Sequence, residues 1–594
     1  MRAAGLLTML LALMVRLAVA QERDSSDVEA VLETLEDAVQ GEALAERIAE
    51  LRARPLDLNT AGADALAELP GVSLLLAERI VRYRETHGGF RSLPELLQVT
   101  GVSEALYGAL RPFLTLGTTT EPTRRRVSPY PAVPSWQTLR QELRLDLAQR
   151  YARRLDSLED GFLGDPARLL TRVRLTSRDR LAAVLVLDKD PGERFIWRPD
   201  QGSYGYDFVS AGLALRRWGR FDALVLGDFV ASFGQGLVLG RTGAMGKGRE
   251  ATRGVARTGP GLTLHGSSEE NRFYRGAGAS VQVYPGLSLT AFGSMRTLDA
   301  SPADDSLTVS SLGTSGLHRT DAELARKDYL HERAWGSALR FRRGPVDAGV
   351  LYAGATFKPP LYPGDAPFDR YDLRGTNYSA VSAFGRLLMG PALAFGEAAR
   401  SHNGALAATG GVLLGLAQAG ELVVAGRHYD RAFQAPHGEA FGQRGGPAVN
   451  ERGVYVGARL RPSRTVTATA YIDSYRFPYL RFNTYRPTEG FDVLISLEHR
   501  PRRWLTYHLL VRHERKEESL RTLDALGRDV RTVAPQARAA MRLHGEYVFS
   551  RRLTLRSRVE GVRFTPQQGD AEFGVLLYQD VHLVPVRGLA LELR

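Results

Sequence analysis

Two glycine turns thirty residues apart carry the clearest chemical signal in the sequence. The first is Gly71-Val72-Ser73 and the second is Gly101-Val102-Ser103. Each stands directly before a predicted helix, where free backbone N–H groups form an anion site that suits a phosphate. Basic side chains on the helix after the first turn could add positive charge. The candidate contact residues are Gly71, Val72, Ser73, Arg79, Arg82, Gly101, Val102 and Ser103.

The rest of the chain shows no residue pattern that predicts catalysis, a cofactor or a metal site. Cys is absent, and the 12 His residues lack zinc-ligand spacings such as HExxH. The run GAMGKG at residues 243–248 hints at a phosphate loop. However, Arg241 stands where that motif needs glycine, and Gly248 where it needs a hydroxyl. We therefore expect Lys247 in a flexible loop, and we expect no enzyme and no cofactor.

Two helical hairpins must position the glycine turns. Pro70-Gly71 ends one helix, and a second helix runs from about Leu74 to His87 before Gly88-Gly89 ends it. A third helix leads to the second glycine turn, and a fourth ends near Pro112. Because the triplet Gly-Val-Ser recurs at the same place in both halves, we predict two hairpins packed on one another.

Residues 56–116 contain LNTA, LPGV, AERIVRYRE, GGF and LPELLQVTGV in this order. This combination resembles the tandem helix-hairpin-helix domain of the competence-type DNA receptor family. The resemblance implies a small all-α domain, which we place at residues 54–116, and non-specific binding of the DNA backbone.

The residues after each turn favour a different role. Leu74, Leu75 and Leu76 stand where the family usually has basic residues, and Glu104 puts a carboxylate at the second phosphate site. Residues 52–117 hold seven acidic and seven basic residues, so the domain lacks the positive charge expected of a DNA-binding surface. Two alternatives stay open: contact with DNA, or docking of a protein or capping of a barrel by the exposed leucines.

The segments that flank the domain indicate export. Residues 1–20 read as a signal peptide, because Arg2 precedes an apolar run and Ala18-Val19-Ala20 fits a cleavage site. Residues 21–53 form an acidic segment with a helical pattern, and residues 21–51 carry a net charge of −8. A Pro/Thr/Arg linker follows at 117–135. Residues 118–594 are basic, with a net charge of +18.

From residue 136 onward the hydrophobic period is two. Segments of about ten residues, the length of a tilted membrane-spanning strand, alternate apolar and polar side chains. The series begins with Leu139, Leu143, Leu145 and Leu147, and it continues to Leu505, Tyr507, Leu509 and Val511. The uncharged run 401–420 fits two short strands that turn at Thr409-Gly410-Gly411 better than a membrane helix.

A soluble sandwich or propeller would alternate too. However, no blade-length repeat occurs, and no strand reads as apolar on both faces. We therefore predict a mainly β fold in which residues 136–594 form a large antiparallel transmembrane β-barrel of about 18–24 strands. His508 and His544 fall on the inward faces of predicted strands. Many inward positions are Arg, so we expect a lumen that favours anions.

Four further segments carry a second resemblance. They are GDFVASFGQGLVLG (227–240), SSEENRFYRGAGASV (267–281), NERGVYVGARLRP (450–462) and YIDSYRFPYLRF (471–482). They are similar to motifs in a family of large Gram-negative barrels with an N-terminal helix-hairpin-helix domain. This resemblance implies the outer membrane as the location, with the N-terminal domain in the periplasm, and it implies no substrate.

The leading hypothesis is a non-enzymatic barrel in outer-membrane lipid whose periplasmic domain gates the lumen or docks a periplasmic protein. A DNA receptor or conduit for DNA uptake is the alternative, and a barrel enzyme is the third. The last residues, GLALELR, give only about seven residues of strand where about ten are needed to span. We therefore expect C-terminal strands to be missing and the seam between residues 138–148 and 587–594 to be incomplete.

Overall fold

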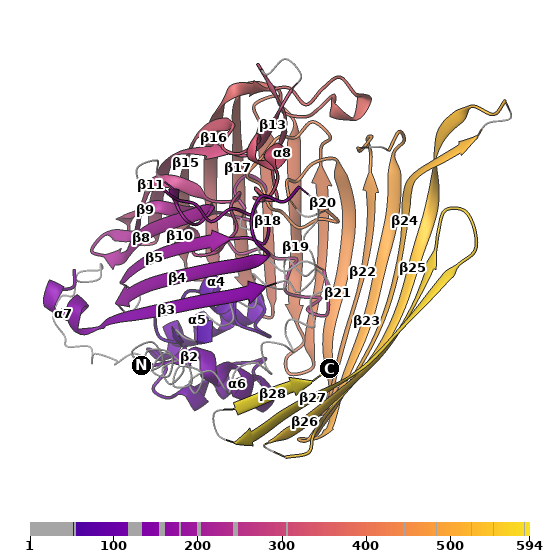
Figure 1. Cartoon of the computed structure of the whole chain (residues 1–594). Coiled ribbons are helices and arrows are strands. Elements are labelled where there is room, and N and C mark those ends of the chain that lie inside the picture. Colours follow the sequence, from indigo (N-terminus) through magenta and orange to yellow (C-terminus); the bar gives the residue numbers. More distant parts are fainter. Residues whose placement is uncertain are drawn as a thin grey trace, which may run out of the picture.

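The computed structural model describes a helical domain and a β-barrel (Figure 1). The described residues are 51–52, 55–116, 133–153, 161–177, 180–198, 203–240, 247–303, 307–444, 446–482, 484–523, 526–550, 552–586 and 589–593. The predicted signal peptide lies outside them, as do nearly all of the acidic segment and most of the linker. Among the described residues, no helix is long and apolar enough to cross a membrane.

Residues 55–116 form the small helical domain that the glycine pattern predicts. Its elements are β1 (Leu56–Asp57), α4 (Ala63–Leu66), α5 (Leu74–His87), η1 (Leu93–Gln98), α6 (Glu104–Leu110), η2 (Arg111–Phe113) and β2 (Leu114–Thr115). The parallel pairing of β1 with β2 brings the two ends of the domain together. A core of its own, which includes Leu58, Leu66, Leu96 and Leu110, lies between the two hairpins.

The remaining described residues form one large antiparallel sheet, with two short α-helices, a 3-10 helix and a small separate hairpin. The barrel strands are β3 (Leu143–Arg153), β4 (Ala167–Ser177), β5 (Leu181–Lys189), β8 (Phe208–Trp218), β9 (Phe221–Ser232), β10 (Gly261–Leu264), β11 (Tyr274–Tyr284), β12 (Leu287–Leu298), β13 (Ala300–Pro302), β14 (Val309–Leu312), β15 (Leu330–Arg343), β16 (Val346–Leu361), β17 (Gly375–Met389), β18 (Ala392–Ser401), β19 (Leu406–Gly415), β20 (Gly420–Tyr429), β21 (Glu451–Ser463), β22 (Val466–Phe477), β23 (Thr488–Arg502), β24 (Leu505–Leu523), β25 (Asp529–Val548), β26 (Leu553–Thr565), β27 (Glu572–Val586) and β28 (Leu589–Leu593). The other elements are α7 (Trp136–Gln141), α8 (Asp321–Leu324), η4 (Pro367–Asp369), β6 (Trp197–Arg198) and β7 (Ser203–Tyr204).

The strand order is that of a closed barrel in which nearly every strand pairs with its neighbours in sequence. The number of strands falls within the expected range, and the mainly β fold is confirmed. In this order β28 lies between β27 and β3, and its residue pairs join it to β27. The five residues of β28 are few beside the 15 of β27. The absence of further C-terminal strands stays a prediction.

Many long strands, such as β15, β17 and β20, alternate buried and exposed residues, as the period of two requires. Strands β3 and β27, in contrast, have no buried residues. In β15 the buried side chains include Leu330, Glu332 and Ala334, and the exposed ones include Trp335 and Leu339. An apolar band of such exposed residues runs around the barrel; examples are Leu147, Leu213, Met295, Val350, Val381, Val412, Val424, Val456, Ile472, Ile495, Val511, Met541 and Leu577. A barrel surface of this kind matches lipid.

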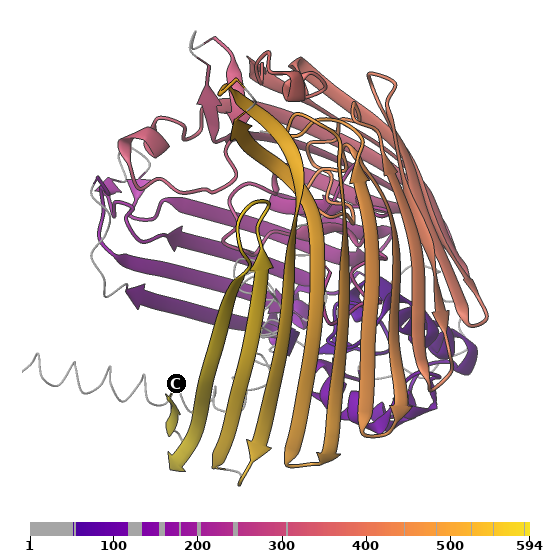
Figure 2. The same ribbon diagram turned by 90° about the vertical axis from the view of Figure 1, so that its right-hand side faces the viewer.

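The two ends of the barrel differ. At one end tight turns join the strands, for example between Arg343 and Val346 and between Ser463 and Val466. Exposed aromatic side chains lie near these turns: Tyr284, Phe341, Trp504, Tyr547 and Phe549. The long connections, such as those from β5 to β8 and from β12 to β15, all lie at the opposite end. The helical domain lies at the end with the tight turns (Figures 1 and 2).

Two local predictions in the barrel are wrong. Leu139 does not begin a strand, because Ser135 accepts a hydrogen bond from the Thr138 N–H and starts α7, so that the first strand begins at Leu143. Thr409-Gly410-Gly411 does not turn. It runs through the middle of β19, where Gly410 pairs with Gly396 of β18 and with Gly426 of β20.

Candidate functional site

The two glycine turns have the same local structure. Gly71 and Gly101 both have positive φ, 73° and 104°, which favours glycine over residues with a Cβ. Ser73 and Ser103 then cap α5 and α6 by accepting the backbone N–H of Leu76 and Leu106, at 3.1 and 3.2 Å.

The turns also pack on one another in a reciprocal way. The Cα of Gly71 lies against Leu106 of the second hairpin, and the Cα of Gly101 lies against Leu76 of the first. This confirms the predicted pair of packed hairpins.

The first hairpin contacts the barrel with its leucines. Leu74 and Leu75 are 2% and 0% exposed, and they belong to one apolar cluster with barrel side chains. The barrel members of this cluster include Leu388, Leu393, Phe395, Leu413, Val423, Tyr455 and Tyr471. Leu76 is buried in the domain's own core. The expectation of exposed leucines is therefore wrong, because the inner wall of the barrel covers them.

Polar contacts surround this apolar patch. The Ser73 hydroxyl donates to Glu421 of β20 at 2.6 Å. Arg79 donates to the carbonyl of Thr100 in the second hairpin at 3.4 Å and to that of Pro391 at 3.3 Å. Arg461 of β21 donates to the Gly101 carbonyl at 3.4 Å. Both turns thus contact the barrel, the first with its helix N-terminus and the second with a carbonyl.

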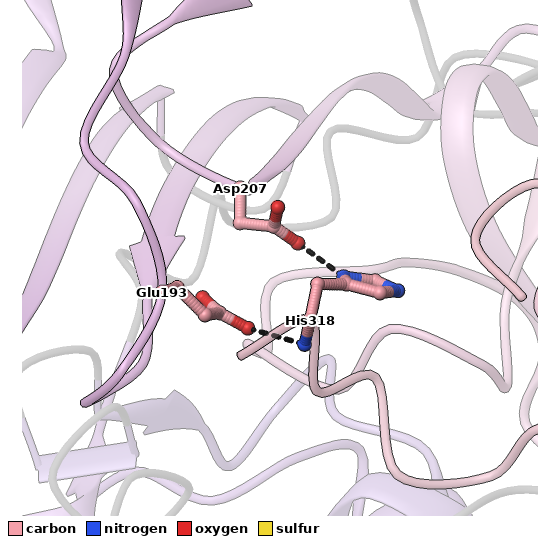
Figure 3. A group of neighbouring side chains, drawn as sticks. All are labelled: Glu193, Asp207 and His318. Atoms are coloured by element: carbon pink, nitrogen blue, oxygen red, sulfur yellow. Dashed lines mark hydrogen bonds and ion pairs between the residues drawn. The ribbon is translucent and has the colours of Figure 1, made fainter. Parts of the chain in front are cut away.

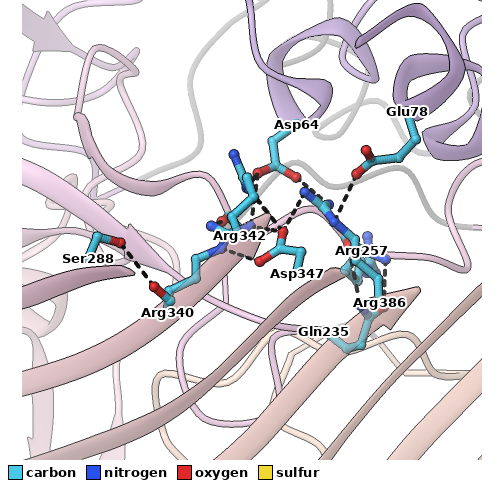
Figure 4. A network of polar contacts seen from close by, with 10 residues as sticks. Asp64, Glu78, Gln235, Arg257, Ser288, Arg340, Arg342, Asp347 and Arg386 are labelled. Carbon is cyan, nitrogen blue, oxygen red and sulfur yellow. Dashed lines mark hydrogen bonds and ion pairs between the residues drawn. The ribbon is translucent and has the colours of Figure 1, made fainter. Parts of the chain in front are cut away.

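An ion-pair network around Asp64 of α4 also links the domain to the barrel (Figure 4). Its carboxylate lies 2.6 Å from Arg386 and 3.0 Å from Arg342, and Arg340 lies 3.3 Å away. Asp347 contacts the same three arginines, and Glu78 of α5 lies 3.0 Å from Arg386. Because Arg342 pairs with Asp347 across β15–β16 and Asp347 with Arg386 across β16–β17, the barrel presents these charges as one row.

Electrostatics within this network favour an ionised Asp64. Burial by itself would raise the pKa of Asp64, but the charges of Arg386, Arg340 and Arg342 outweigh it and hold the pKa well below its usual range. Burial also raises the pKa of Glu78, and there it outweighs the charge of Arg386. Loss of one partner from a buried pair of this type costs about 3–5 kcal/mol, because it leaves an uncompensated charge. Asp64 therefore holds the domain in place.

The predicted contact residues divide between the two hairpins. Gly71, Ser73 and Arg79 lie on the side that meets the barrel, and Val72 is fully buried in the domain's own core. Gly101 contacts the barrel through its carbonyl, Val102 is buried in the domain, and Ser103 and Arg82 are half-buried. Phosphate contact by these residues stays a prediction. The sequence analysis missed Asp64 and Glu78, whose barrel partners are hundreds of residues away and leave no local signal.

The inside of the barrel is packed with apolar side chains. Segments 233–240, 433–444 and 446–448 fold into the lumen and join an apolar cluster with inward side chains of β9, β12 and β15–β19. Glu397 of β18 anchors the first segment by accepting the backbone N–H groups of Gln235 and Leu237. Strands β15 and β16 thus carry buried apolar residues on the inner face and exposed apolar residues on the outer face. The expectation that no strand is apolar on both faces is therefore wrong for these two strands.

Lys247 is also part of this packed interior. Its side chain is 7% exposed and lies 2.9 Å from Asp473 and 3.4 Å from Asp492. The prediction of a flexible loop at Lys247 is therefore wrong, because inward carboxylates of β22 and β23 hold it.

Several inward arginines pair with inward carboxylates: Arg296 with Glu332, Arg427 with Glu451 and Asp473, Arg512 with Asp492, Arg542 with Glu560, and Arg556 with Glu546. These pairs weaken the expectation that the lumen favours anions. His508 and His544 face inward as predicted, and the Arg249 guanidinium lies 2.6 Å from His508.

A separate polar cluster ties the long connections together at the opposite end of the barrel. Glu193, Asp207 and His318 bring possible metal-ligand atoms within 4.8 Å of one another (Figure 3). Each of these groups already has a protein partner. His318 contacts Asp207 through Nδ1 and Asp299 through Nε2, its backbone N–H donates to Glu193, and Lys327 donates to Asp207. The arrangement is that of an internal ion-pair network.

The pKa values in this cluster depend on burial and on these partners. Burial and the charge of Asp207 raise the pKa of Glu193 to about 7. Burial and the charges of Asp207 and Glu193 raise that of Glu270 to about 9. For His318, burial alone would lower the pKa, but hydrogen bonds to Asp207 and Asp299 raise it to about 10.

Comparisons with known proteins bear on the two parts separately. Residues 52–115 match the family model of the helix-hairpin-helix motif. An uncharacterized protein of Haemophilus influenzae is 34% identical to this chain over 81 residues, which are 14% of this chain and 72% of that protein.

Solved structures similar to the barrel include OccAB4 of Acinetobacter baumannii and OpdK of Pseudomonas aeruginosa. OccAB4 is 9% identical with a TM-score of 0.27, and covers 74% of this chain and 96% of its own. OpdK is 13% identical with a TM-score of 0.27, and covers 74% of this chain and 99% of its own. Through residues 52–115, the chain belongs to the helix-hairpin-helix motif family.

Proposed function

We propose that the chain is a non-enzymatic outer-membrane β-barrel whose helix-hairpin-helix domain closes the lumen from the periplasmic end and acts as its gate. The observation that carries this proposal is the burial of Asp64 among three barrel arginines, beside two leucines that are buried against the barrel wall. In this arrangement the chain's own barrel occupies the helix N-terminus that would otherwise meet a phosphate. The alternative of DNA uptake requires that surface to be free.

The orientation follows from the connections. Bacterial barrels have short turns on the periplasmic side and longer loops outside. The domain lies at the end with the short turns, which supports a periplasmic position. A single cysteine at Glu104, an exposed position on the second hairpin, tests this point. A membrane-impermeant thiol reagent should label it only after the outer membrane has been permeabilised, and labelling of intact cells would contradict the orientation.

Gating can be tested by locking the domain in place. The chain has no cysteine of its own, so Ser73→Cys with Glu421→Cys gives one defined pair at a hydrogen-bonded contact. A short, cleavable thiol cross-linker should join the pair in the full-length chain. In planar bilayers we expect the cross-linked protein to show few openings and the cleaved protein to recover them. Equal conductance before and after cleavage would exclude a gate at this contact.

DNA binding is measured on the same locked and cleaved protein. We expect affinity for duplex DNA no tighter than ordinary non-specific binding, about 10⁻⁴–10⁻⁶ M. Submicromolar binding at physiological salt that disappears with Arg79→Glu or Arg82→Glu would favour the DNA receptor instead.

A further inference from the structure

A row of basic side chains lies on the outer surface of the barrel, near the end with the long connections. On three consecutive strands the inward neighbours Arg427, Tyr455 and Tyr475 are buried, while His428, Arg452 and Arg476 are exposed. Residue pairing places His428 beside Arg452 and Arg452 beside Arg476. The three side chains therefore form one continuous row on the face that meets lipid.

The height of this row is that of the membrane surface. Below it, the outward residues Val424, Val454, Val456 and Ile472 are apolar. Arg476 lies ten residues along β22 from Val466, which begins the strand at the tight turn. At about 3.4 Å per residue and a tilt of about 40°, this separation is about 25 Å along the membrane normal. An apolar band of a barrel has about this height, so the guanidinium groups lie at the level of lipid headgroups.

The charges in this row lack the neutralisation that the inward arginines have. Among the described residues, neither Arg452 nor Arg476 forms an ion pair, and like charges directly opposite one another on adjacent strands are destabilising. Glu489 pairs with Arg476 across β22–β23, but its carboxylate makes no ion pair with it. Two arginines at paired positions on adjacent strands suit an anion with several oxygens, because each guanidinium can bind phosphate through two parallel N–H groups.

We propose that Arg452 and Arg476, flanked by His428, bind the phosphate group of an anionic lipid in the leaflet at the long-loop end of the barrel. The proposal shares with the proposed function only the placement in a membrane. It does not depend on the gate, because the row lies on the outer face and the domain docks inside the barrel at the other end. A failed lipid test and a failed conductance test are therefore distinguishable.

The test uses the full-length chain in nanodiscs of phosphatidylcholine, with or without lipid A as the phosphate-bearing lipid. The variant is Arg452→Gln with Arg476→Gln. The control is Arg333→Gln, because Arg333 is an exposed outward arginine whose cross-strand neighbours Met295 and Thr356 are uncharged. Native mass spectrometry measures bound lipid A, and thermal unfolding measures stability.

We expect the double variant to retain about tenfold less lipid A than the wild type, and the Arg333 variant to retain as much as the wild type. In phosphatidylcholine alone, the double variant should be at least as stable as the wild type, since it removes a repulsion. With lipid A, the wild type should gain stability and the double variant should not. Conversion of both arginines to lysine should restore only part of the binding, because lysine lacks the paired donors.

Equal retention of lipid A by the double variant and the Arg333 control would overturn the proposal. So would equal stabilisation of the wild type and the double variant by lipid A, since that result means that lipid A binds without these two arginines. Competition by inorganic phosphate at concentrations that match lipid A would also count against it, because the site would then bind the free anion.

Discussion

The two hairpins of the helical domain share a sequence and a backbone, and they differ in what surrounds them. Both have Gly-Val-Ser at the turn, a glycine with positive φ and a serine cap. The first continues with Leu74 and Leu75, which are buried against the barrel, and the second continues with Glu104, which is exposed. The same local structure thus forms an apolar docking surface in the first copy. In the second copy the residue after the serine cap is exposed, and the turn contacts the barrel through the Gly101 carbonyl.

The largest effect is expected at Asp64. Asp64→Asn removes the charge between Arg340, Arg342 and Arg386 and should weaken docking of the first hairpin by about 3–5 kcal/mol. Glu95→Gln is the matched change near the second hairpin, where the carboxylate contacts only its own segment, and it should cost less than about 1 kcal/mol. Cross-linking between cysteines at 73 and 421 measures docking in each background. Similar losses in both variants would mean that the two hairpins are held alike.

A swap of the residues after the serines tests the comparison directly. Leu74→Glu gives the first hairpin the sequence of the second and buries a carboxylate in an apolar cluster, so the domain should undock at a cost of at least about 2–3 kcal/mol. The reverse change, Glu104→Leu, alters an exposed position and should stay within about 0.5 kcal/mol. Protease sensitivity of the domain in the full-length chain reports undocking, and a protected Leu74→Glu domain would contradict the docking surface.

The serine caps should separate the hairpins by a smaller amount. Ser103→Ala removes an N-cap and should cost about 1 kcal/mol. Ser73→Ala removes the equivalent cap and also the 2.6 Å hydrogen bond to Glu421, which leaves a carboxylate with one donor fewer, so its cost should be about 1–2 kcal/mol higher. The difference between the two denaturation midpoints is the measurement, and equal midpoints would mean that the Glu421 contact adds nothing.

The smallest effect is expected from a rise in pH. Docking of the helical domain should hardly respond to it, whereas the cluster of Glu193, Glu270 and His318 at the end with the long connections should lose stability. The raised pKa values of Glu193 (about 7), Glu270 (about 9) and His318 (about 10) give stability that is lost as the pH rises through these values. The lowered pKa of Asp64 gives stability that is present above pH 3.8 and is lost only on acidification. Between pH 6.5 and about 10, proteolysis of the loop that contains His318 should therefore increase while cross-linking at 73 and 421 stays constant.

A Glu78→Gln background serves as the control for this titration. Burial raises the pKa of Glu78, so its contribution to docking is lost as the pH rises, whereas that of Asp64 is lost as the pH falls. If docking weakens with rising pH in the wild type but not in this background, Glu78 is the cause. Weakening in both would contradict the role given to Asp64.

The sequence by itself determined the parts of this protein that depend on near neighbours. The recurrence of Gly71-Val72-Ser73 at Gly101-Val102-Ser103 predicted the hairpins, because turns and caps depend on a few adjacent residues. Alternation predicted the barrel, because successive side chains of a strand point to opposite faces. Local signals also misled where tertiary pairing overrode them, as at Gly410, which pairs with glycines on both neighbouring strands and continues β19 through a predicted turn.

Only the tertiary structure decided what the hairpins and charges contact. Asp64 meets Arg340 and Arg386 across 276 and 322 residues of chain, and Lys247 meets Asp473 across 226. No local pattern marks such pairs, because the low dielectric of a buried site, and not sequence spacing, makes a charge require a partner. The same holds for Leu74 and Leu75: their sequence showed that they could not bind phosphate as cations do, and the barrel wall decided that they are buried.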